Sequence, residues 1–237
     1  MIILAFDGTA KCASCAVLRD EVCLGEYNID NGLTQSELLL PMAESLMKSL
    51  KLEYSDVELF ATSVGPGSFT GVRIGAALVK GLAFGRNIPC AEVSTLEALA
   101  ENASGLRGII VPAMDARRGQ VYTAIFRCDG ENLTRLCEDM AISITELGER
   151  LREFEGESIY ITGDGYEVAR KNMSAIGLKL ENTPVALRNE SAASVAKVAL
   201  RQYREGKTVS DVELSPTYLR LPQAERKRLE RSKNNEK

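Results

Sequence analysis

Residues 63–75 read SVGPGSFTGVRIG, a glycine-rich turn between an apolar, strand-like run and a helix-like run. Gly65 and Gly67 permit backbone conformations closed to other residues, and they allow a ligand or another chain segment to approach closely. Ser68 can cap the following helix. Backbone N–H groups at such a helix start can hold a phosphate, but the turn matches neither a P-loop nor a dinucleotide-binding fingerprint. Two interpretations stay open, an anion-binding loop and a tight structural turn.

The order of elements around this turn occurs twice in the chain. The first half runs strand, two hairpin strands, helix, strand and helix; its first strand ends at Asp7 and its last at the Gly65 turn. The second half repeats this order, with a first strand that ends at Asp115 and a later strand that ends in a turn with Gly163 and Gly165. This duplication predicts an α/β protein with a duplicated actin-like ATPase (ASKHA, ribonuclease H-like) fold, in which two lobes with mixed central sheets face a cleft.

The duplication also predicts how the chain is divided. Residues 1–104 are expected to form an N-terminal lobe that carries the GPGSFTG motif and two strongly apolar helices, and residues 105–213 a smaller C-terminal lobe. Residues 214–237 combine an extended segment with a charged tail, and the extended segment is expected to return to the N-terminal lobe.

Composition and charge exclude several classes of function. The 237 residues include 29 basic and 33 acidic side chains and no histidine, for a net charge of −4. This balance argues against a protein that binds nucleic acid over its whole surface. Without histidine there is no imidazole base, no Ser-His-Asp triad and no histidine-ligated metal. Residues 1–7 are typical of a strand rather than a signal peptide, and no apolar run could span a bilayer, so we expect a cytoplasmic protein without a membrane contact.

The helices predicted at residues 34–50 and 68–84 are apolar around most of their circumference. Such a helix is normally buried on two sides, and its own sheet covers only one of them. The second cover is either a helix of the same lobe or another protein chain. In the latter case Gly71 and Gly75 would permit a partner helix to cross closely. The candidate interface residues are then Leu38, Leu39, Met42, Leu46, Gly71, Ile74, Gly75, Leu78 and Val79.

In actin-like folds, turns at equivalent strands of the two lobes clasp nucleotide phosphates. Asp7 and Asp115 would hold Mg²⁺ through water, with the glycine turns around the phosphates. The sequence thus leaves weak ATP or ADP binding with Mg²⁺ open, while no cofactor is required. The candidate nucleotide- or anion-binding residues are Asp7, Gly8, Thr9, Gly65, Gly67, Ser68, Asp115, Gly163 and Gly165.

Four motifs carry a resemblance to a known family. Residues 1–7 read MIILAFD and are predicted to form a strand. Residues 65–71 read GPGSFTG and follow a later strand. Residues 114–122 read MDARRGQVY, and residues 216–220 read PTYLR. In this order, from residue 1 to about residue 220, the motifs resemble those of the TsaB/YeaZ family.

The resemblance implies a fold, a pathway and partners. It implies the actin-like fold and a role in the synthesis of threonylcarbamoyladenosine on tRNA. The partners would be TsaD, a catalytic paralogue, and TsaE, an ATPase. Family members also form homodimers when alone, and both kinds of dimer use the two helices of the first lobe. The tRNA would be contacted only through the complex.

The resemblance also bears on catalysis. TsaD holds a metal with two histidines four residues apart, and Thr95 and Leu99 stand at these positions here. Leucine cannot ligate a metal and a lone threonine is a poor ligand, so we expect no catalytic residue and no metal ligand. The chain is then a non-catalytic subunit that binds and stabilises TsaD. Two alternatives stay open, a weak nucleotide-binding ATPase acting on its own and a tRNA-binding module that uses Arg73, Arg117, Arg118 and the basic tail.

Overall fold

The computed structural model describes residues 1–220. The predicted charged tail, residues 221–237, lies outside the described residues. No helix in the described range combines the length and the apolar character needed to cross a bilayer.

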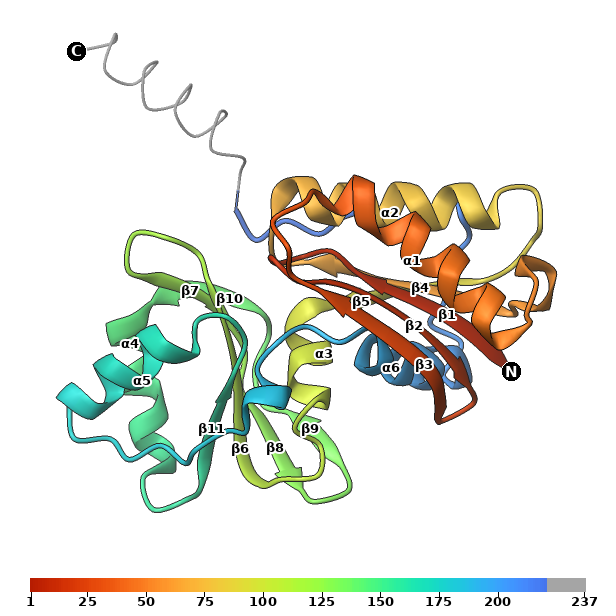
Figure 1. The fold of residues 1–237 in the computed structure, drawn as a ribbon. Coiled ribbons are helices and arrows are strands. Elements are labelled where there is room, and N and C mark those ends of the chain that lie inside the picture. The colour runs from red at the N-terminus through yellow and green to blue at the C-terminus, as the bar shows by residue number, and fades with distance from the viewer. Residues whose placement is uncertain (221–237) are drawn as a thin grey trace, which may run out of the picture.

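The first sheet has five strands in the order β3-β2-β1-β4-β5 (Figure 1). Its strands are β1 (Ile2–Asp7), β2 (Ala13–Arg19), β3 (Val22–Ile29), β4 (Leu59–Gly65) and β5 (Cys90–Ser94). The central strand β1 pairs antiparallel with β2 and parallel with β4, so the sheet is mixed. Every residue of β1 is buried, as expected for a strand covered on both faces.

Helices cover both faces of this sheet. They are α1 (Gln35–Leu50) and α2 (Phe69–Ala83) on one face, α6 (Ala192–Arg204) on the other, and a 3-10 turn (Tyr54–Asp56) that follows α1. Successive side chains of a strand point to opposite faces. Leu4 and Phe6 of β1 therefore pack in the core below α1 and α2, whereas Ile3 and Ala5 pack in the core against α6.

The second sheet repeats this plan around its own central strand, β6. Its strands are β6 (Arg107–Asp115), β7 (Gln120–Thr123), β8 (Phe126–Asp129), β9 (Leu133–Arg135), β10 (Met140–Ser143) and β11 (Ile159–Thr162). β6 pairs antiparallel with β7 and β8 and parallel with β11. Its helices are α3 (Thr95–Glu101), α4 (Ile144–Leu151) and α5 (Tyr166–Ala175), with 3-10 turns at Arg152–Phe154 and Val185–Leu187. Two mixed sheets, each with a central strand that pairs both antiparallel and parallel, confirm the predicted fold class. The predicted order of the second half is wrong in one respect: four short strands, β7 to β10, stand where two hairpin strands were expected. The predicted strand is interrupted between β7 and β8 because these strands pair with different parts of β6.

Helices α3 and α6 each pack on the sheet that is formed by the other half of the chain. α3 belongs to the N-terminal part of the sequence, yet its Leu96 and Leu99 pack in the core of the second sheet. α6 lies within residues 105–213, the predicted C-terminal lobe, yet its Val195 and Val198 pack on the first sheet. The physical reason is that each sheet has a second apolar face that the two helices on its first face cannot cover. No single cut in the chain therefore separates the lobes.

After α6 the chain returns along the first lobe as an extended segment, residues 209–220, which we call the C-terminal strap. Val209 forms an isolated antiparallel bridge with Cys90 at the start of β5. Further on, Thr217 N donates a hydrogen bond to Val64 O at 2.7 Å. The strap thus runs from the edge of the first sheet to the glycine turn at the end of β4.

Gly71 and Gly75 serve the inside of the lobe rather than a partner interface. Both glycines are buried in α2. A Cβ atom on Gly71 would collide with the carbonyl oxygen of Gly8 in the β1–β2 turn, and one on Gly75 would lie 2.7 Å from Thr62 Oγ1 on β4. The glycines let α2 approach its own sheet, so the predicted role in a close crossing by a partner helix is wrong for these two residues.

Replacing Gly71 with alanine should therefore lower the free energy of unfolding by about 2 kcal/mol or more, because the β1–β2 turn must shift. Gly81 is the matched control, because a Cβ atom there meets no atom within 4 Å. Gly81→Ala should raise the free energy of unfolding by roughly 0.5–1 kcal/mol through helix propensity. Urea denaturation measures both changes. Equal effects at the two positions would contradict the close approach of α2 to its sheet.

Candidate functional site

A cleft of about 530 Å³ lies between the lobes. Five segments line it: the β1–β2 turn, the glycine turn with the start of α2, the hairpin between β6 and β7, Asp164 in the turn between β11 and α5, and the C-terminal strap. Here the nine residues predicted to bind an anion can be located. Those that line the cleft are Thr9, Gly67, Ser68 and Asp115, and those that do not are Asp7, Gly8, Gly65, Gly163 and Gly165.

Asp7 is a buried carboxylate at the end of β1. It accepts hydrogen bonds from Thr9 N at 2.8 Å and from Thr9 Oγ1 at 2.6 Å, and Ser63 Oγ on β4 donates to its other oxygen. Burial raises the pKa of Asp7, although the hydrogen bonds from Ser63 and Thr9 act in the opposite direction. Both carboxylate oxygens are thus engaged in joining β1, the β1–β2 turn and β4.

The Gly65-Pro66-Gly67 turn contacts two other segments of the same chain. On one side, Ser68 N donates to Thr9 O at 2.6 Å, and a Cβ atom on Gly67 would lie 2.5 Å from that same oxygen. On the other side, a Cβ atom on Gly65 would collide with the carbonyl oxygen of Thr217 in the strap. The close approach that these glycines permit is therefore made by the protein itself.

The corresponding turn of the second lobe is engaged in the same way. Gly163 N donates at 2.8 Å to a carbonyl of the segment before α6, and Gly165 N donates at 2.9 Å to a carbonyl of β6. Asp115 is exposed, and its Oδ1 accepts a hydrogen bond at 2.7 Å from the backbone of its own hairpin. Several of the groups predicted to hold Mg²⁺ and nucleotide phosphates are thus hydrogen-bonded within the chain, whereas Asp115 is exposed and only its Oδ1 accepts such a bond in the described residues.

Helix α3 occupies the place where the family resemblance puts the metal-binding histidines of TsaD. Thr95 and Leu99 are both buried, and Leu99 packs in the core of the second sheet. Thr95 Oγ1 has no hydrogen-bond partner within residues 1–220. In the same range, no three His, Cys, Asp or Glu side chains gather in a way that could hold a metal ion.

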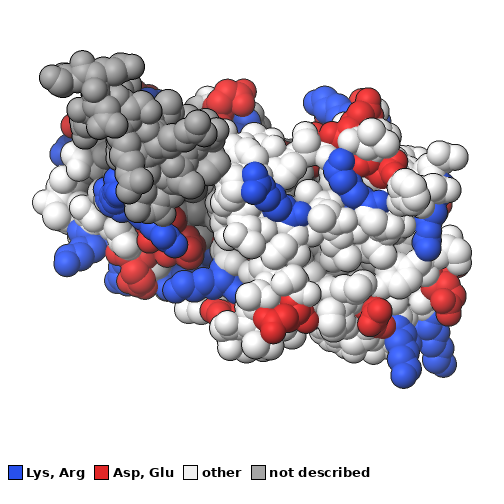
Figure 2. Space-filling model, turned by 90° about the horizontal axis from the view of Figure 1, so that it is seen from above, with Lys and Arg blue, Asp and Glu red and all other residues white. Residues whose placement is uncertain are grey.

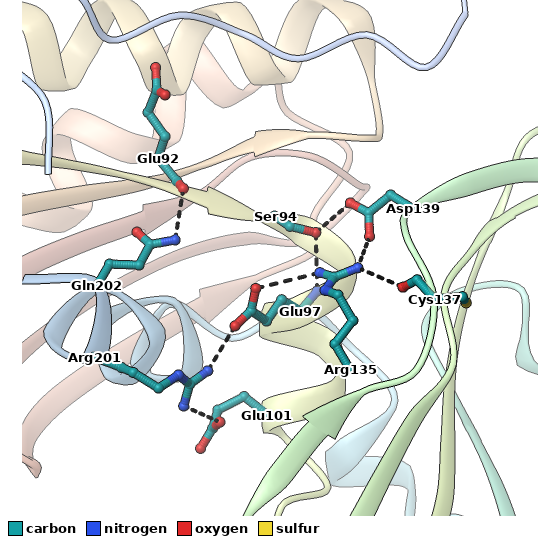
Figure 3. A network of polar contacts seen from close by, with 9 residues as sticks. All are labelled: Glu92, Ser94, Glu97, Glu101, Arg135, Cys137, Asp139, Arg201 and Gln202. Atoms are coloured by element: carbon teal, nitrogen blue, oxygen red, sulfur yellow. Dashed lines mark hydrogen bonds and ion pairs between the residues drawn. The ribbon is translucent and has the colours of Figure 1, made fainter. Parts of the chain in front are cut away.

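A network of ion pairs joins α3 to the second lobe and to α6 (Figure 3). Glu97 of α3 pairs with Arg135 of β9 at 3.4 Å and with Arg201 of α6 at 2.9 Å. Asp139, between β9 and β10, pairs with Arg135 at 2.6 Å and accepts a hydrogen bond from Ser94 Oγ at 2.6 Å. The inter-lobe network consists of Ser94, Glu97, Glu101, Arg135, Asp139 and Arg201.

Glu190 is a second buried acid near the lobe junction, and sequence analysis did not identify it. It precedes Ser191, the N-cap of α6, and its Oε1 has no hydrogen-bond partner in the described part of the chain. Burial raises the pKa of Glu190 well above its usual value, and the nearby carboxylate of Asp7 raises it further. The neutral form of Glu190 is therefore more strongly favoured in the folded protein than in a solvent-exposed glutamate.

The predicted interface residues of α1 and α2 divide into two groups. Those buried in the core beside the first sheet are Leu38, Leu39, Met42, Leu46 and Val79. For this group the second cover is the neighbouring helix of the same lobe, because α1 and α2 pack side by side in one core. Ile74 and Leu78 are only partly buried. Sequence analysis missed two exposed small residues on the same side of α2, Ala77 and Gly81. They could have been identified from the 3.6-residue period of the helix, which places them away from the stripe of buried apolar residues.

These observations define a class: a two-lobed protein of actin-like fold whose glycine turns at the cleft are contacted by other segments of its own chain. A family model described as "TsaD: tRNA N6-adenosine threonylcarbamoyltransferase" matches residues 34–227. The chain is 32% identical to "tRNA threonylcarbamoyladenosine biosynthesis protein TsaB" of Bacillus subtilis, over 98% of this chain and 100% of the relative. The same-named protein of Escherichia coli is 32% identical over 93% and 95%. The chain belongs to the TsaB/YeaZ family.

Solved structures agree on the fold. "YeaZ from Pseudomonas aeruginosa" is 24% identical with a TM-score of 0.75, over 92% of this chain and 99% of that one. Component A of the (R)-2-hydroxyglutaryl-CoA dehydratase of Acidaminococcus fermentans is 11% identical with a TM-score of 0.50, over 86% and 99%. At such identities the likeness bears on architecture alone, and it confirms the two-lobed arrangement.

The inter-lobe network yields a stability prediction. Glu97→Gln leaves two partly buried arginines without the carboxylate between them, so the free energy of unfolding should fall by about 1–2 kcal/mol. Glu146→Gln is the control, since it removes an exposed pair with Arg150 one helical turn away on α4. That change should stay within about 0.5 kcal/mol. Denaturant titration of both variants tests the prediction, which fails if the two losses are equal.

Glu190 yields a pH prediction. Its pKa is raised in the folded state, so its contribution to stability is fully present below the unfolded pKa of about 4.3 and is lost as pH rises toward the folded pKa. Glu190→Gln keeps the neutral shape and removes this loss. The variant should match the natural protein in Tm near pH 4 and exceed it increasingly toward neutral pH. A Tm difference independent of pH would show that Glu190 does not titrate in this way.

Proposed function

We propose that the chain is a non-catalytic subunit of the machinery that makes N6-threonylcarbamoyladenosine on tRNA, and that it binds and stabilises TsaD. The names of the relatives at 32% identity support this pathway. In this proposal TsaE joins the assembly, the chain forms a homodimer when alone, and tRNA is contacted only through the complex. The subunit needs no cofactor of its own.

The outer surface of α1 and α2 carries the proposal. We call it the docking face, and it consists of Leu40, Ile74, Ala77, Leu78 and Gly81. Leu40 is 40% exposed, and the space beside Gly81 is open. Figure 2 shows this side of the first lobe as a largely uncharged surface with scattered charged groups.

The shape of the docking face favours a helix as the contacting element of TsaD. Ile74 and Leu78 project beside the small residues Ala77 and Gly81, which are exposed on the same side of α2. Small residues let another backbone approach closely, and the flanking apolar side chains add buried area. This contact uses the outward side of α2, whereas Gly71 and Gly75 lie on its inward side.

The chemistry of the chain supports the division of labour with TsaD. The sequence contains no histidine, and α3 presents Thr95 and Leu99 to a packed core. Neither side chain offers the soft or charged donor atoms that bind catalytic metals. The proposal therefore assigns the transfer step to TsaD. This chain is assigned the binding and positioning of TsaD.

Ala77→Arg tests the docking face. Ala77 is exposed, so the protomer should remain folded, while an unpaired charge in the contact should weaken TsaD binding at least about tenfold. Ala175→Arg is the control, because it adds the same charge at an exposed alanine at the end of α5. Size-exclusion chromatography with purified TsaD measures binding. Undiminished binding by Ala77→Arg would locate the interface elsewhere.

The pathway assignment has its own test. Purified TsaD and TsaE with the other substrates should modify tRNA only when this chain is added. Modification at full rate without the chain would refute the proposal, as would modification by the chain alone.

A further inference from the structure

The mouth of the cleft carries cations from three separate segments. Lys11 of the β1–β2 turn, Arg117 of the β6–β7 hairpin and Arg220 of the strap all line it. Within residues 1–220 none of the three forms an ion pair with a carboxylate. The two acids that line the cleft, Asp115 and Asp164, instead accept hydrogen bonds from backbone amides at 2.7 and 2.9 Å. No direct carboxylate contact thus neutralises any of the three cations in the described residues, although Lys11 acts electrostatically on Asp164 from beyond ion-pair distance.

Arg117 is held in an unusual conformation. Arg117 and Arg118 have φ values of 64° and 57°, which cost a residue with a side chain about 1 kcal/mol or more each. The hairpin keeps this shape because Gln120 N donates to Arg117 O at 3.2 Å and Arg117 N donates to Asp115. Arg117 lines the cleft, and Arg118 does not. Backbone strain of this kind concentrates at ligand sites.

Arg220 is oriented before any ligand arrives. Its Nη1 donates to Ala116 O at 3.3 Å, and its guanidinium lies 5.5 Å from the ring centroid of Tyr122. A side chain already held in place loses less conformational entropy when it binds a ligand. Arg220 therefore joins the strap to the same hairpin that presents Arg117.

We infer that the mouth of the cleft binds a phosphate group through Lys11, Arg117 and Arg220, without a metal ion. Guanidinium groups match the geometry of phosphate oxygens, and a lysine adds a mobile point charge. This site differs from a nucleotide clasp, because the turn amides and Asp7 are engaged within the chain. The phosphate comes from a free nucleotide or from an RNA backbone. The inference goes beyond the proposed function, which requires no ligand in the cleft.

The test uses the full chain at low ionic strength. Three probes are titrated, namely inorganic phosphate, ADP and a short single-stranded RNA, each with and without EDTA. Arg117→Asn removes the charge and keeps a residue that tolerates positive φ, so the hairpin should persist. Arg118→Asn is the matched control on the adjacent residue outside the cleft.

We expect Arg117→Asn to weaken binding about tenfold or more, since a charge-assisted contact is lost. Arg118→Asn should change it little, and EDTA should have no effect. If RNA is the ligand, Arg117→Asn should also lower the salt-dependence slope by about 0.7. Lys11→Gln, at an exposed position, provides a second variant if the hairpin change perturbs folding.

The probes separate the two sources of phosphate. Tighter binding of ADP than of RNA identifies a nucleotide, and the reverse identifies an RNA backbone. The inference is overturned if no probe binds, if binding requires Mg²⁺, or if Arg117→Asn and Arg118→Asn weaken binding equally.

Discussion

Helices α3 and α6 pack against each other between the lobes. α6 covers one face of the first sheet, and α3 covers one face of the second sheet. Neither sheet has both faces covered without a helix from the other half of the chain. The ion pairs of Glu97 with Arg135 and Arg201 lie at this crossing. Because packed cores shift between discrete arrangements rather than deform continuously, rotation of one lobe against the other would expose apolar surface and separate these pairs. The shape of the cleft follows from this constraint.

Contacts within the first lobe determine the state of the cleft wall on that side. Asp7 bonds to Ser63, Ser68 N bonds to Thr9, and the strap contacts Gly65. Each of these contacts uses a group that an actin-like nucleotide site would need. The sequence motif with its glycines is therefore explained by close contacts within the protein. What the cleft retains for a ligand is side-chain charge at its mouth.

The order of elements in the first lobe, the sheet types and the strand-end positions of Asp7 and Asp115 could be predicted from the sequence, because hydrophobic period and turn residues are local signals. The division of the second lobe's hairpin strands into β7 to β10 could not, because it depends on which part of β6 each strand pairs with. The side of α2 that is left exposed could not be predicted either. Gly71 and Gly75 lie on one side and Ala77 and Gly81 on the other, and small residues alone do not indicate which side meets the sheet. The position of α6 was missed for a related reason, since both sheets offer an apolar face to an amphipathic helix.

Helix α2 contributes to both the cleft and the docking face, because its start lines the cleft and its outer side belongs to the docking face. Its start is held by Ser68 and Gly71 against the β1–β2 turn, and Arg73 Nε donates to Tyr218 of the strap at 2.8 Å. A helix secured at its start and along its inner side presents its outer side in one geometry. Association then costs less ordering entropy than it would for a mobile surface. The contacts of the glycine turns and the crossing of α3 and α6 thus fix the outer side of α2, which is the property that the proposed function requires of the docking face.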